Sequence, residues 1–172
     1  MNNKRKTEYM EKKKEVLIII PAYNEEKTIT ALLEQLEKPE ISELADVLVM
    51  NDASLDSTNW ITKRRNHAVV THVFNLGYGS SLQLGYKYAV RKKYQYVIQM
   101  DADGQHLPEY IEALIKKINE GYDIVIGSRF VTEKKPKSMR MLGSNMISWA
   151  IHMTTGVRVM DPTSGMRIFN RN

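Results

Sequence analysis

The fold can be traced outward from residues 96–108, Tyr96-Val97-Ile98-Gln99-Met100-Asp101-Ala102-Asp103-Gly104-Gln105-His106-Leu107-Pro108. The stretch begins as a short apolar run, which is typical of a buried strand, and two aspartates spaced i, i+2 end it. Pro108 then indicates the start of a helix. Ligands of an open α/β sheet lie outside the carboxyl ends of its strands, so we expect both carboxylates to face a pocket there. Such a pair suits a hard divalent cation, although Asp101 and Asp103 could also serve only to end a strand and cap a helix.

Short apolar runs alternate with helical patterns along the rest of the chain. Further strands are predicted at residues 16–20, 47–50, 68–73 and 124–126. The helix between the first two strands has Asn24 as its predicted N-cap and presents one apolar face, made of Ile29, Leu32, Leu33 and Leu36. Repeated β-α-β units with near-continuous apolar strands predict a single α/β domain, in which helices cover both faces of a mostly parallel sheet.

Composition and charge narrow the class of protein. The 172 residues are 42% apolar and 26% charged, as in a soluble globular domain, and the absence of cysteine excludes disulfides and thiolate metal sites. The net charge of +5 is uneven: residues 1–15 carry six Lys/Arg against three Glu, and residues 129–140 carry five against one. Such patches suit phosphate-rich ligands or an anionic membrane surface, or are simply solvated. Nucleic acid is not expected, because the basic stretches lack interleaved aromatic residues.

Residues 141–157 come nearest to a membrane segment. They carry no formal charge between Arg140 and Arg158, but several polar residues interrupt them. No stretch reaches the roughly 20 predominantly apolar residues of a membrane span. The pattern therefore predicts a helix that lies in the core or at an interface. Residues 1–14 are expected to form a basic polar tail before the domain.

Polar residues gather directly after the predicted strands, and these positions meet at one edge of a parallel sheet. They are Tyr23 and Glu25, then Asn51 and Asp52, then Asp101, Asp103 and Gln105, and finally Arg129. This set of residues suits a nucleotide diphosphate. An acid can accept a hydrogen bond from an N–H of the base, a metal held by the acids can bridge the phosphates, and an arginine can bind their oxygens. The Gly-x-Gly-x-x-Gly motif of dinucleotide-binding domains is absent after the first strand, and so is the Gly-Lys-Ser/Thr of P-loops.

Six motifs in order carry a resemblance to a known family. They are Pro21-Ala22-Tyr23-Asn24-Glu25-Glu26, Asn51-Asp52-Ala53-Ser54-Leu55-Asp56-Ser57-Thr58, Asn75-Leu76-Gly77-Tyr78-Gly79, Asp101-Ala102-Asp103-Gly104-Gln105-His106, Gly127-Ser128-Arg129 and Asp161-Pro162-Thr163-Ser164-Gly165-Met166-Arg167. Together they resemble the family 2 glycosyltransferases of GT-A fold, most closely the dolichyl-phosphate mannose synthase-like branch. Asn51 and Ala53 depart from the family pattern, which often has an acid and a glycine there. Members of this branch continue past the last motif, so we expect the catalytic domain, residues 15–172, to be shorter than theirs at its C-terminal end.

The resemblance implies a Rossmann-like GT-A domain and a role for each matching residue. Nucleoside contacts are implied for Pro21, Tyr23, Glu25 and Asp52, and donor contacts also for Ala102. Asp101, Asp103 and Gln105 would bind Mg²⁺ or Mn²⁺, which bridges the donor diphosphate. Arg129 would neutralise further charge, and Asp103 and Arg129 are thus expected to be catalytic.

The resemblance also implies an acceptor and a location. The sugar of a UDP- or GDP-sugar would pass with inversion to a polyprenyl phosphate, whose oxygen needs no base. A saccharide hydroxyl acceptor would need one, and Asp161 is then the candidate, unless it only forms a turn with Gly165.

We expect a cytoplasmic protein at the inner face of the membrane, in peripheral contact with it and capable of homo-oligomerisation. A catalytically silent nucleotide-sugar-binding module is the alternative. A sugar-nucleotide pyrophosphorylase is disfavoured, because no glycine-rich basic loop follows the first strand.

Overall fold

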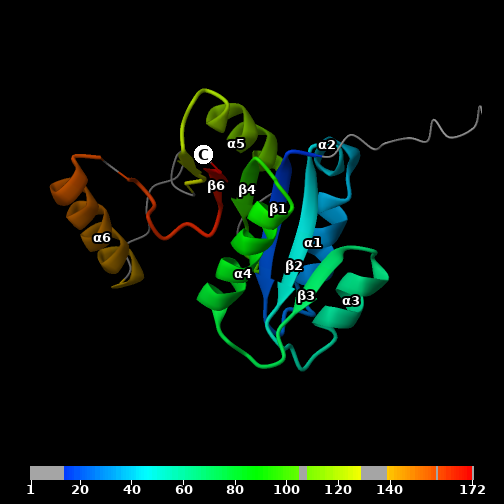
Figure 1. Ribbon diagram of the computed structural model, residues 1–172. Helices are drawn as coiled ribbons and strands as arrows, with labels where there is room; N and C mark the ends of the chain where they lie inside the picture. The colour runs from blue at the N-terminus through cyan, green and yellow to red at the C-terminus, as the bar shows by residue number, and fades with distance from the viewer. Residues whose placement is uncertain (1–13, 105–107, 129–138, 158, 172) are drawn as a thin grey trace, which may run out of the picture.

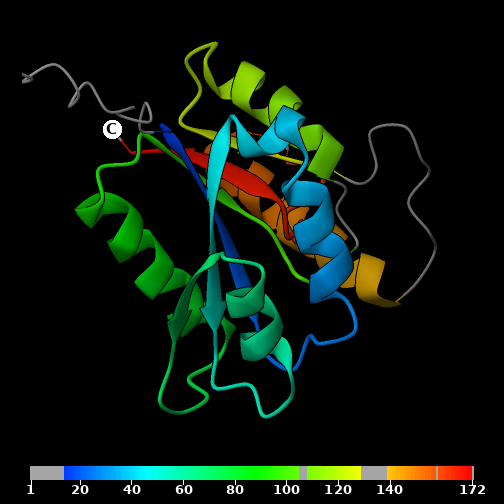
Figure 2. The ribbon, with the colours of Figure 1, turned by 90° about the vertical axis from the view of Figure 1, so that its right-hand side faces the viewer.

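The protein folds into an open α/β sheet with helices on both sides (Figures 1 and 2). The computed structural model describes residues 14–104, 108–128, 139–157 and 159–171, with residues 139–142 described as backbone only. Its strands are β1 Val16–Ala22, β2 Ala45–Asn51, β3 Ala68–Thr71, β4 Tyr96–Gln99, β5 Ile124–Ile126 and β6 Arg167–Asn170. Its helices are α1 Ile29–Leu36, α2 Pro39–Ser42, α3 Thr58–Arg64, α4 Tyr78–Arg91, α5 Ile111–Ile118 and α6 Met139–Thr155, with a 3₁₀ turn, η1, at Pro108–Tyr110.

The six strands lie in the order β3-β2-β1-β4-β6-β5. β1 to β4 are mutually parallel, as the alternation of strands and helices predicts. β6 is antiparallel and lies between β4 and β5, and the sequence analysis did not predict it. Its four residues have polar ends around Ile168 and Phe169, so they give too short an apolar run to be distinguished from a loop. Their pairing partners also lie far away in the sequence.

The central strand β1 explains why the sheet is covered on both faces. All seven of its residues are buried. Successive side chains of a strand point to opposite faces, so Ile18 and Ile20 pack on one side, where α1 and α5 supply the rest of the core. Leu17 and Ile19 point to the other side and pack under α4. Figure 2 shows α4 on one side of the sheet and α1 and α5 on the other.

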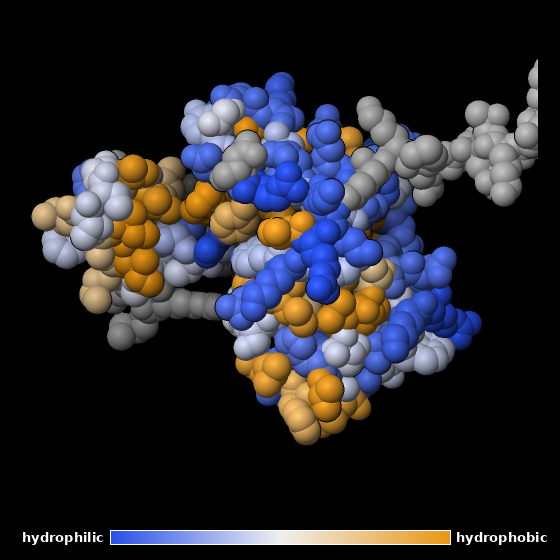
Figure 3. All heavy atoms as spheres, viewed as in Figure 1, coloured by the Kyte–Doolittle hydropathy of each residue, from blue (hydrophilic) through white to orange (hydrophobic). Residues whose placement is uncertain are grey.

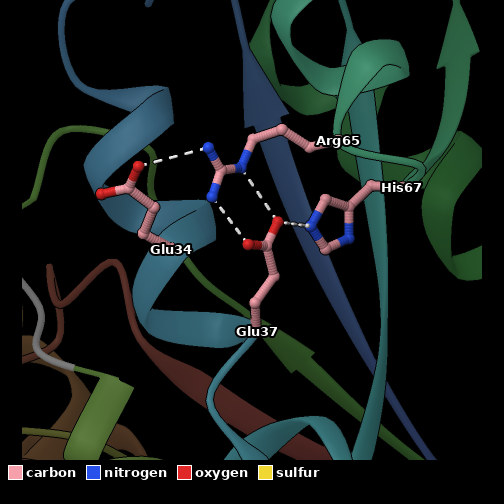
Figure 4. A network of polar contacts seen from close by, with 4 residues as sticks. All are labelled: Glu34, Glu37, Arg65 and His67. Atoms are coloured by element: carbon pink, nitrogen blue, oxygen red, sulfur yellow. Dashed lines mark hydrogen bonds and ion pairs between the residues drawn. The ribbon is translucent and has the colours of Figure 1, made fainter.

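A polar network near the amino end of β3 links α1 to the segment between α3 and β3 (Figure 4). Arg65 holds Glu37 through two hydrogen bonds of 2.9 and 2.7 Å and reaches Glu34 at 3.2 Å. His67 lies 2.9 Å from the same Glu37 carboxylate. The hydrogen bond from Arg65 is the main cause that lowers the pKa of Glu37. This network lies at the sheet edge opposite the predicted site, so its contribution is to the fold.

Helix α6 lies at the surface and not in the core. Its described side chains include Met146, Trp149 and Met153, which are 73%, 64% and 65% exposed. In Figure 1 the helix lies apart from the sheet, and Figure 3 shows apolar atoms gathered along it. The sequence left two positions open for this helix, in the core or at an interface. The prediction of a core position is therefore wrong. Within the described residues, no helix combines the length and apolar character needed to cross a bilayer.

Candidate active site

A pocket of about 220 Å³ lies at the carboxyl ends of β1, β2 and β4. Its walls include every described residue for which donor contact was predicted, namely Pro21, Tyr23, Glu25, Asp52, Asp101, Ala102 and Asp103. Ala22, Tyr78 and Ser81 complete the lining. Gln105 and Arg129, two further predicted site residues, lie outside the described residues. The loops after three strands thus bring the predicted acids to one edge of the sheet.

The loops after β1 and β2 are bonded to one another, which fixes one side of this pocket. Asn24 donates its N–H to Ser54 Oγ at 3.0 Å and accepts the N–H of Leu55 at 2.8 Å. Glu25 donates its N–H to Thr58 Oγ1 at 2.8 Å. The prediction that Asn24 caps the following helix is therefore wrong: that helix begins at Ile29 with Thr28 as N-cap, and Asn24 has a φ of 56°. The side-chain amide of Asn24 instead connects the loop after β1 to the loop after β2.

Asp52 is almost fully buried, with 3% of its surface exposed. Its carboxylate accepts hydrogen bonds from His72 Nδ1 at 2.7 Å and from the N–H groups of Leu76 and Gly77 at 2.9 and 2.7 Å. Burial would raise the pKa of Asp52, but these hydrogen bonds together lower it below its usual value. A carboxylate has about four acceptor positions, so Asp52 can hold the loop after β3 and still accept one further hydrogen bond from the pocket.

The two departures from the family pattern have local structural consequences. Asn51 is buried, accepts the N–H of Ser54 at 3.2 Å and donates its amide to Thr71 Oγ1 at 3.4 Å. A carboxylate at this position could accept but could not make that donation. Ala53 has a φ of 57°, a left-handed conformation that glycine adopts at lower cost. The glycine common in the family would therefore fit this backbone with less strain.

Asp101 is reached by a chain of hydrogen bonds that runs along one side of the sheet. Tyr86 Oη donates to Gln99 Oε1 at 2.8 Å, and Gln99 Nε2 donates to Tyr78 Oη at 2.7 Å. Tyr78 Oη then donates to Asp101 Oδ1 at 2.5 Å. Burial, and after it the hydrogen bond to Asp101, raises the pKa of Tyr78 well above its usual value. A tyrosine hydroxyl is protonated at neutral pH even at its ordinary pKa, and the raised pKa keeps it a donor at higher pH as well.

Gly165 approaches the same carboxylate from the C-terminal motif. A Cβ atom at position 165 would lie 1.8 Å from Asp101 Oδ2 and 2.4 Å from its Cγ. Gly165 does not have a positive φ, so a left-handed backbone is not the reason for glycine at this position. Glycine is needed here because only a hydrogen atom fits beside the Asp101 side chain.

Asp161 is buried, with 1% of its surface exposed, and it does not belong to the pocket lining. Thr163 Oγ1 donates to its Oδ1 at 3.3 Å. The turn that follows is held by Arg167, whose Nε and guanidinium NH2 group donate to the carbonyl oxygens of Ser164 and Pro162, each at 3.0 Å. These hydrogen bonds within residues 161–167 thus hold the shape of the turn.

No pattern in the sequence predicts a role for Ser81. Its side-chain oxygen is buried in the pocket wall and has no hydrogen-bond partner within the part of the chain that the structure describes. Buried hydroxyl groups are nearly always bonded, so this oxygen is available to a ligand or to water. Tyr78 and Gly165 were also missed as neighbours of Asp101, although both belong to motifs that the sequence analysis quoted. The only signal in the sequence was their place in those motifs.

The arrangement of strands and helices is that of the GT-A fold. Solved glucosyl-3-phosphoglycerate synthase from Mycobacterium tuberculosis, in complex with Mn²⁺, UDP-glucose and phosphoglyceric acid, has the same fold, with a TM-score of 0.70. It is 20% identical in sequence, and the match covers 92% of this chain and 57% of that one. The chain belongs to the family described as glycosyl transferase family 2, whose sequence profile matches residues 17–172.

Two relatives show the branch of the family that the motifs predicted. An undecaprenyl-phosphate mannosyltransferase from Micrococcus luteus is 34% identical over 169 residues, which cover 90% of this chain and 65% of the relative. A polyprenol monophosphomannose synthase from Mycolicibacterium smegmatis is 29% identical over 167 residues, covering 90% and 61%. The chain is thus similar to the dolichyl-phosphate mannose synthase-like enzymes and spans somewhat under two thirds of the length of these curated relatives.

Proposed function

We propose that this chain is the catalytic domain of an inverting, metal-dependent glycosyltransferase that moves a sugar from a UDP- or GDP-sugar to a polyprenyl phosphate. The observation that carries the proposal is the convergence of Glu25, Asp52, Asp101 and Asp103 in one pocket at the carboxyl edge of the sheet. Family membership and the names of the two relatives support the reaction class and the lipid-linked acceptor.

The pocket suits the nucleoside part of the donor in size and chemistry. Pro21 and Ala22 supply an apolar wall, Tyr23 an aromatic ring, and Asp52 an acceptor for an N–H of the base. At about 220 Å³ it is smaller than the roughly 300–1,000 Å³ of pockets that enclose a whole small molecule. The diphosphate and the sugar would then extend past Asp101 and Asp103 along the open rim.

The donor set of the rim fits Mg²⁺ or Mn²⁺. Hard cations of this kind are commonly bound by one or two carboxylates, with waters and substrate phosphates completing the shell. Asp101 and Asp103 supply such a pair, and Gln105 is the third proposed ligand. No cluster of three or more His, Cys, Asp or Glu side chains placed for a metal exists within the described residues, so the donor phosphates would complete the site. When bound, the cation would neutralise the charge of the departing diphosphate.

The reaction proposed for this site is a direct displacement. An oxygen anion of the acceptor phosphate attacks the anomeric carbon, while the bond to the donor diphosphate breaks and its electron pair leaves with the nucleotide. Arg129 would stabilise that leaving charge. Because the phosphate is already an anion, the step needs no general base. Asp161 is buried, with 1% of its surface exposed, which disfavours it as the base that a saccharide hydroxyl would need.

Helix α6 supports a peripheral contact with the cytoplasmic face of a membrane. Its exposed apolar side chains include Met146, Trp149 and Met153. Residues 129–140, the last two of which belong to the helix, carry five Lys/Arg against one Glu, which complements anionic headgroups. Co-sedimentation should therefore be stronger with vesicles that contain phosphatidylglycerol than with phosphatidylcholine alone, and Trp149→Ser should weaken it. Equal recovery with both vesicles would reject the electrostatic part of this contact, and no recovery with either would reject the contact itself.

A thermal-shift panel of UDP-, GDP- and other sugar nucleotides, with and without Mn²⁺, tests the proposed function. A ligand that binds only the folded protein raises the melting temperature in proportion to RT ln(1 + [L]/Kd). At least one sugar nucleotide is expected to do so, and more strongly with Mn²⁺. No shift with any of them would reject the proposal. Transfer or donor hydrolysis by this chain would then distinguish an enzyme from a silent binding module.

A further inference from the structure

We infer that Tyr78 is a positioning residue that fixes the Asp101 carboxylate for the divalent cation. The inference rests on the proposed function, because it assumes that Asp101 is a metal ligand, and it assigns a role to a residue outside the predicted metal-binding and donor-binding set. Its basis is the 2.5 Å hydrogen bond from Tyr78 Oη to Asp101 Oδ1.

The tyrosine is itself held in place, which a positioning residue requires. Gln99 donates to its hydroxyl at 2.7 Å, and Tyr86 donates to Gln99 at 2.8 Å. Gln99 is buried in β4, and the ring of Tyr86 packs edge-on against Phe169 of β6 at 5.7 Å. All three hydrogen bonds point in one direction and end on the carboxylate, so each polarises the next.

The other side of the carboxylate is closed by backbone. Gly165 leaves no room for a side-chain carbon beside Oδ2, so Asp101 lies between the Tyr78 hydroxyl and the C-terminal motif. A carboxylate confined in this way loses little freedom when a cation binds. Without the hydroxyl the carboxylate would have one partner fewer, and cation binding would have to restrict more of its motion. Partners that orient metal ligands typically contribute about 10- to 100-fold to metal affinity.

Tyr94 provides a matched control within the same chain. Its hydroxyl donates to Asp46 Oδ2 at 2.7 Å, a tyrosine–aspartate hydrogen bond of the same kind. It lies at the amino end of the sheet, where Tyr94 and Asp46 line a different pocket. Tyr78→Phe and Tyr94→Phe each remove one hydroxyl that donates to an aspartate and keep the ring, so a loss of Mn²⁺ binding in Tyr78→Phe alone would not be a general effect of removing such a hydrogen bond.

The experiment measures Mn²⁺ binding by the electron paramagnetic resonance signal of free Mn²⁺, for the metal alone and with UDP or GDP present. Tyr78→Phe should weaken Mn²⁺ binding by roughly 10-fold or more, whereas Tyr94→Phe should leave it unchanged. Melting temperatures of both variants, measured without metal, show whether they are folded. Equal Mn²⁺ affinity in the wild type and Tyr78→Phe would overturn the positioning role alone. A wild-type protein that binds no Mn²⁺ under any of these conditions would overturn the metal site and this inference together.

Discussion

Gly165 and Asp101 lie in contact although they come from opposite ends of the second half of the chain. A Cβ atom at position 165 would lie 1.8 Å from Asp101 Oδ2 and 3.2 Å from Asp101 Cβ. The first of these atoms can move by rotation of the side chain, but the second is fixed by the backbone. The Asp-Pro-Thr-Ser-Gly motif thus limits where the Asp101 carboxylate can lie.

Gly165→Ala should therefore leave a folded protein with a displaced Asp101 carboxylate. Mn²⁺ should increase the nucleotide affinity of wild type, and we expect this increase to be smaller in Gly165→Ala by at least roughly 10-fold, as is typical of a disturbed metal environment. Calorimetric titration of nucleotide with and without Mn²⁺ measures it. Gly143→Ala, in α6, is the control, since a Cβ there has nothing within 4 Å. Wild-type affinity in Gly165→Ala would contradict the contact.

Ser81→Ala should affect stability and binding in opposite directions. The wild-type hydroxyl is buried without a partner within the described residues, so its removal should leave the free protein as stable as before or slightly more stable. The loss of one hydrogen bond to the ligand should weaken nucleotide binding by about 3- to 10-fold. Ser80→Ala is the control, because Ser80 Oγ donates to the Leu76 carbonyl at 2.9 Å. Unchanged nucleotide affinity in Ser81→Ala would show that water alone occupies this position.

Asp52→Asn should destabilise the protein in a pH-dependent way. The folded state lowers the pKa of Asp52, so the unfolded chain binds the proton more readily. The stabilisation is then fully present above the unfolded pKa of about 3.9 and is lost as the pH falls through the lower, folded value. Urea unfolding at pH 7 should show a loss on the order of 2 kcal/mol, since the hydrogen bonds are to a charged group. The difference from wild type should shrink below about pH 4, and a constant difference down to pH 2 would contradict the assignment.

Ala53→Gly should stabilise the protein. Alanine in the left-handed region costs roughly 1 kcal/mol, and the greater freedom of glycine in the unfolded chain offsets part of the gain. A rise in melting temperature of about 1–3 °C is expected for a chain of this size. Ala68→Gly, at the start of β3, should lower the melting temperature, because glycine weakens a strand. A fall with Ala53→Gly would mean that the φ of 57° at this position carries no strain.

The sequence predicted the parts of the fold that local patterns encode. The apolar runs predicted the five strands β1 to β5, and the helical pattern from Ile29 to Leu36 predicted the buried face of α1. The pattern could not predict β6, because its position between β4 and β5 depends on pairing with distant residues. For α6, an apolar composition without charge is compatible with either burial or exposure, and only the packing distinguishes them.

The sequence predicted which residues belong to the candidate site, but it did not predict the contacts between them. Strand ends and motifs indicated Glu25, Asp52, Asp101 and Asp103, and the pocket contains all four. The bond between Tyr78 and Asp101 could not be predicted, because it depends on the angle at which α4 begins after Gly77. In the same way, the approach of Gly165 to Asp101 depends on the position of a strand that the sequence did not reveal.

The most direct test of the proposed site is calorimetric titration of the sugar nucleotide selected by the thermal-shift panel into wild type, Asp103→Ala and Asp123→Ala, with and without Mn²⁺. Asp123 is exposed, lies just before β5 and serves as the control. We predict that Mn²⁺ strengthens binding to wild type and Asp123→Ala and that Asp103→Ala loses this gain. Binding of the sugar nucleotide to Asp103→Ala with the wild-type affinity in the presence of Mn²⁺ would contradict the account.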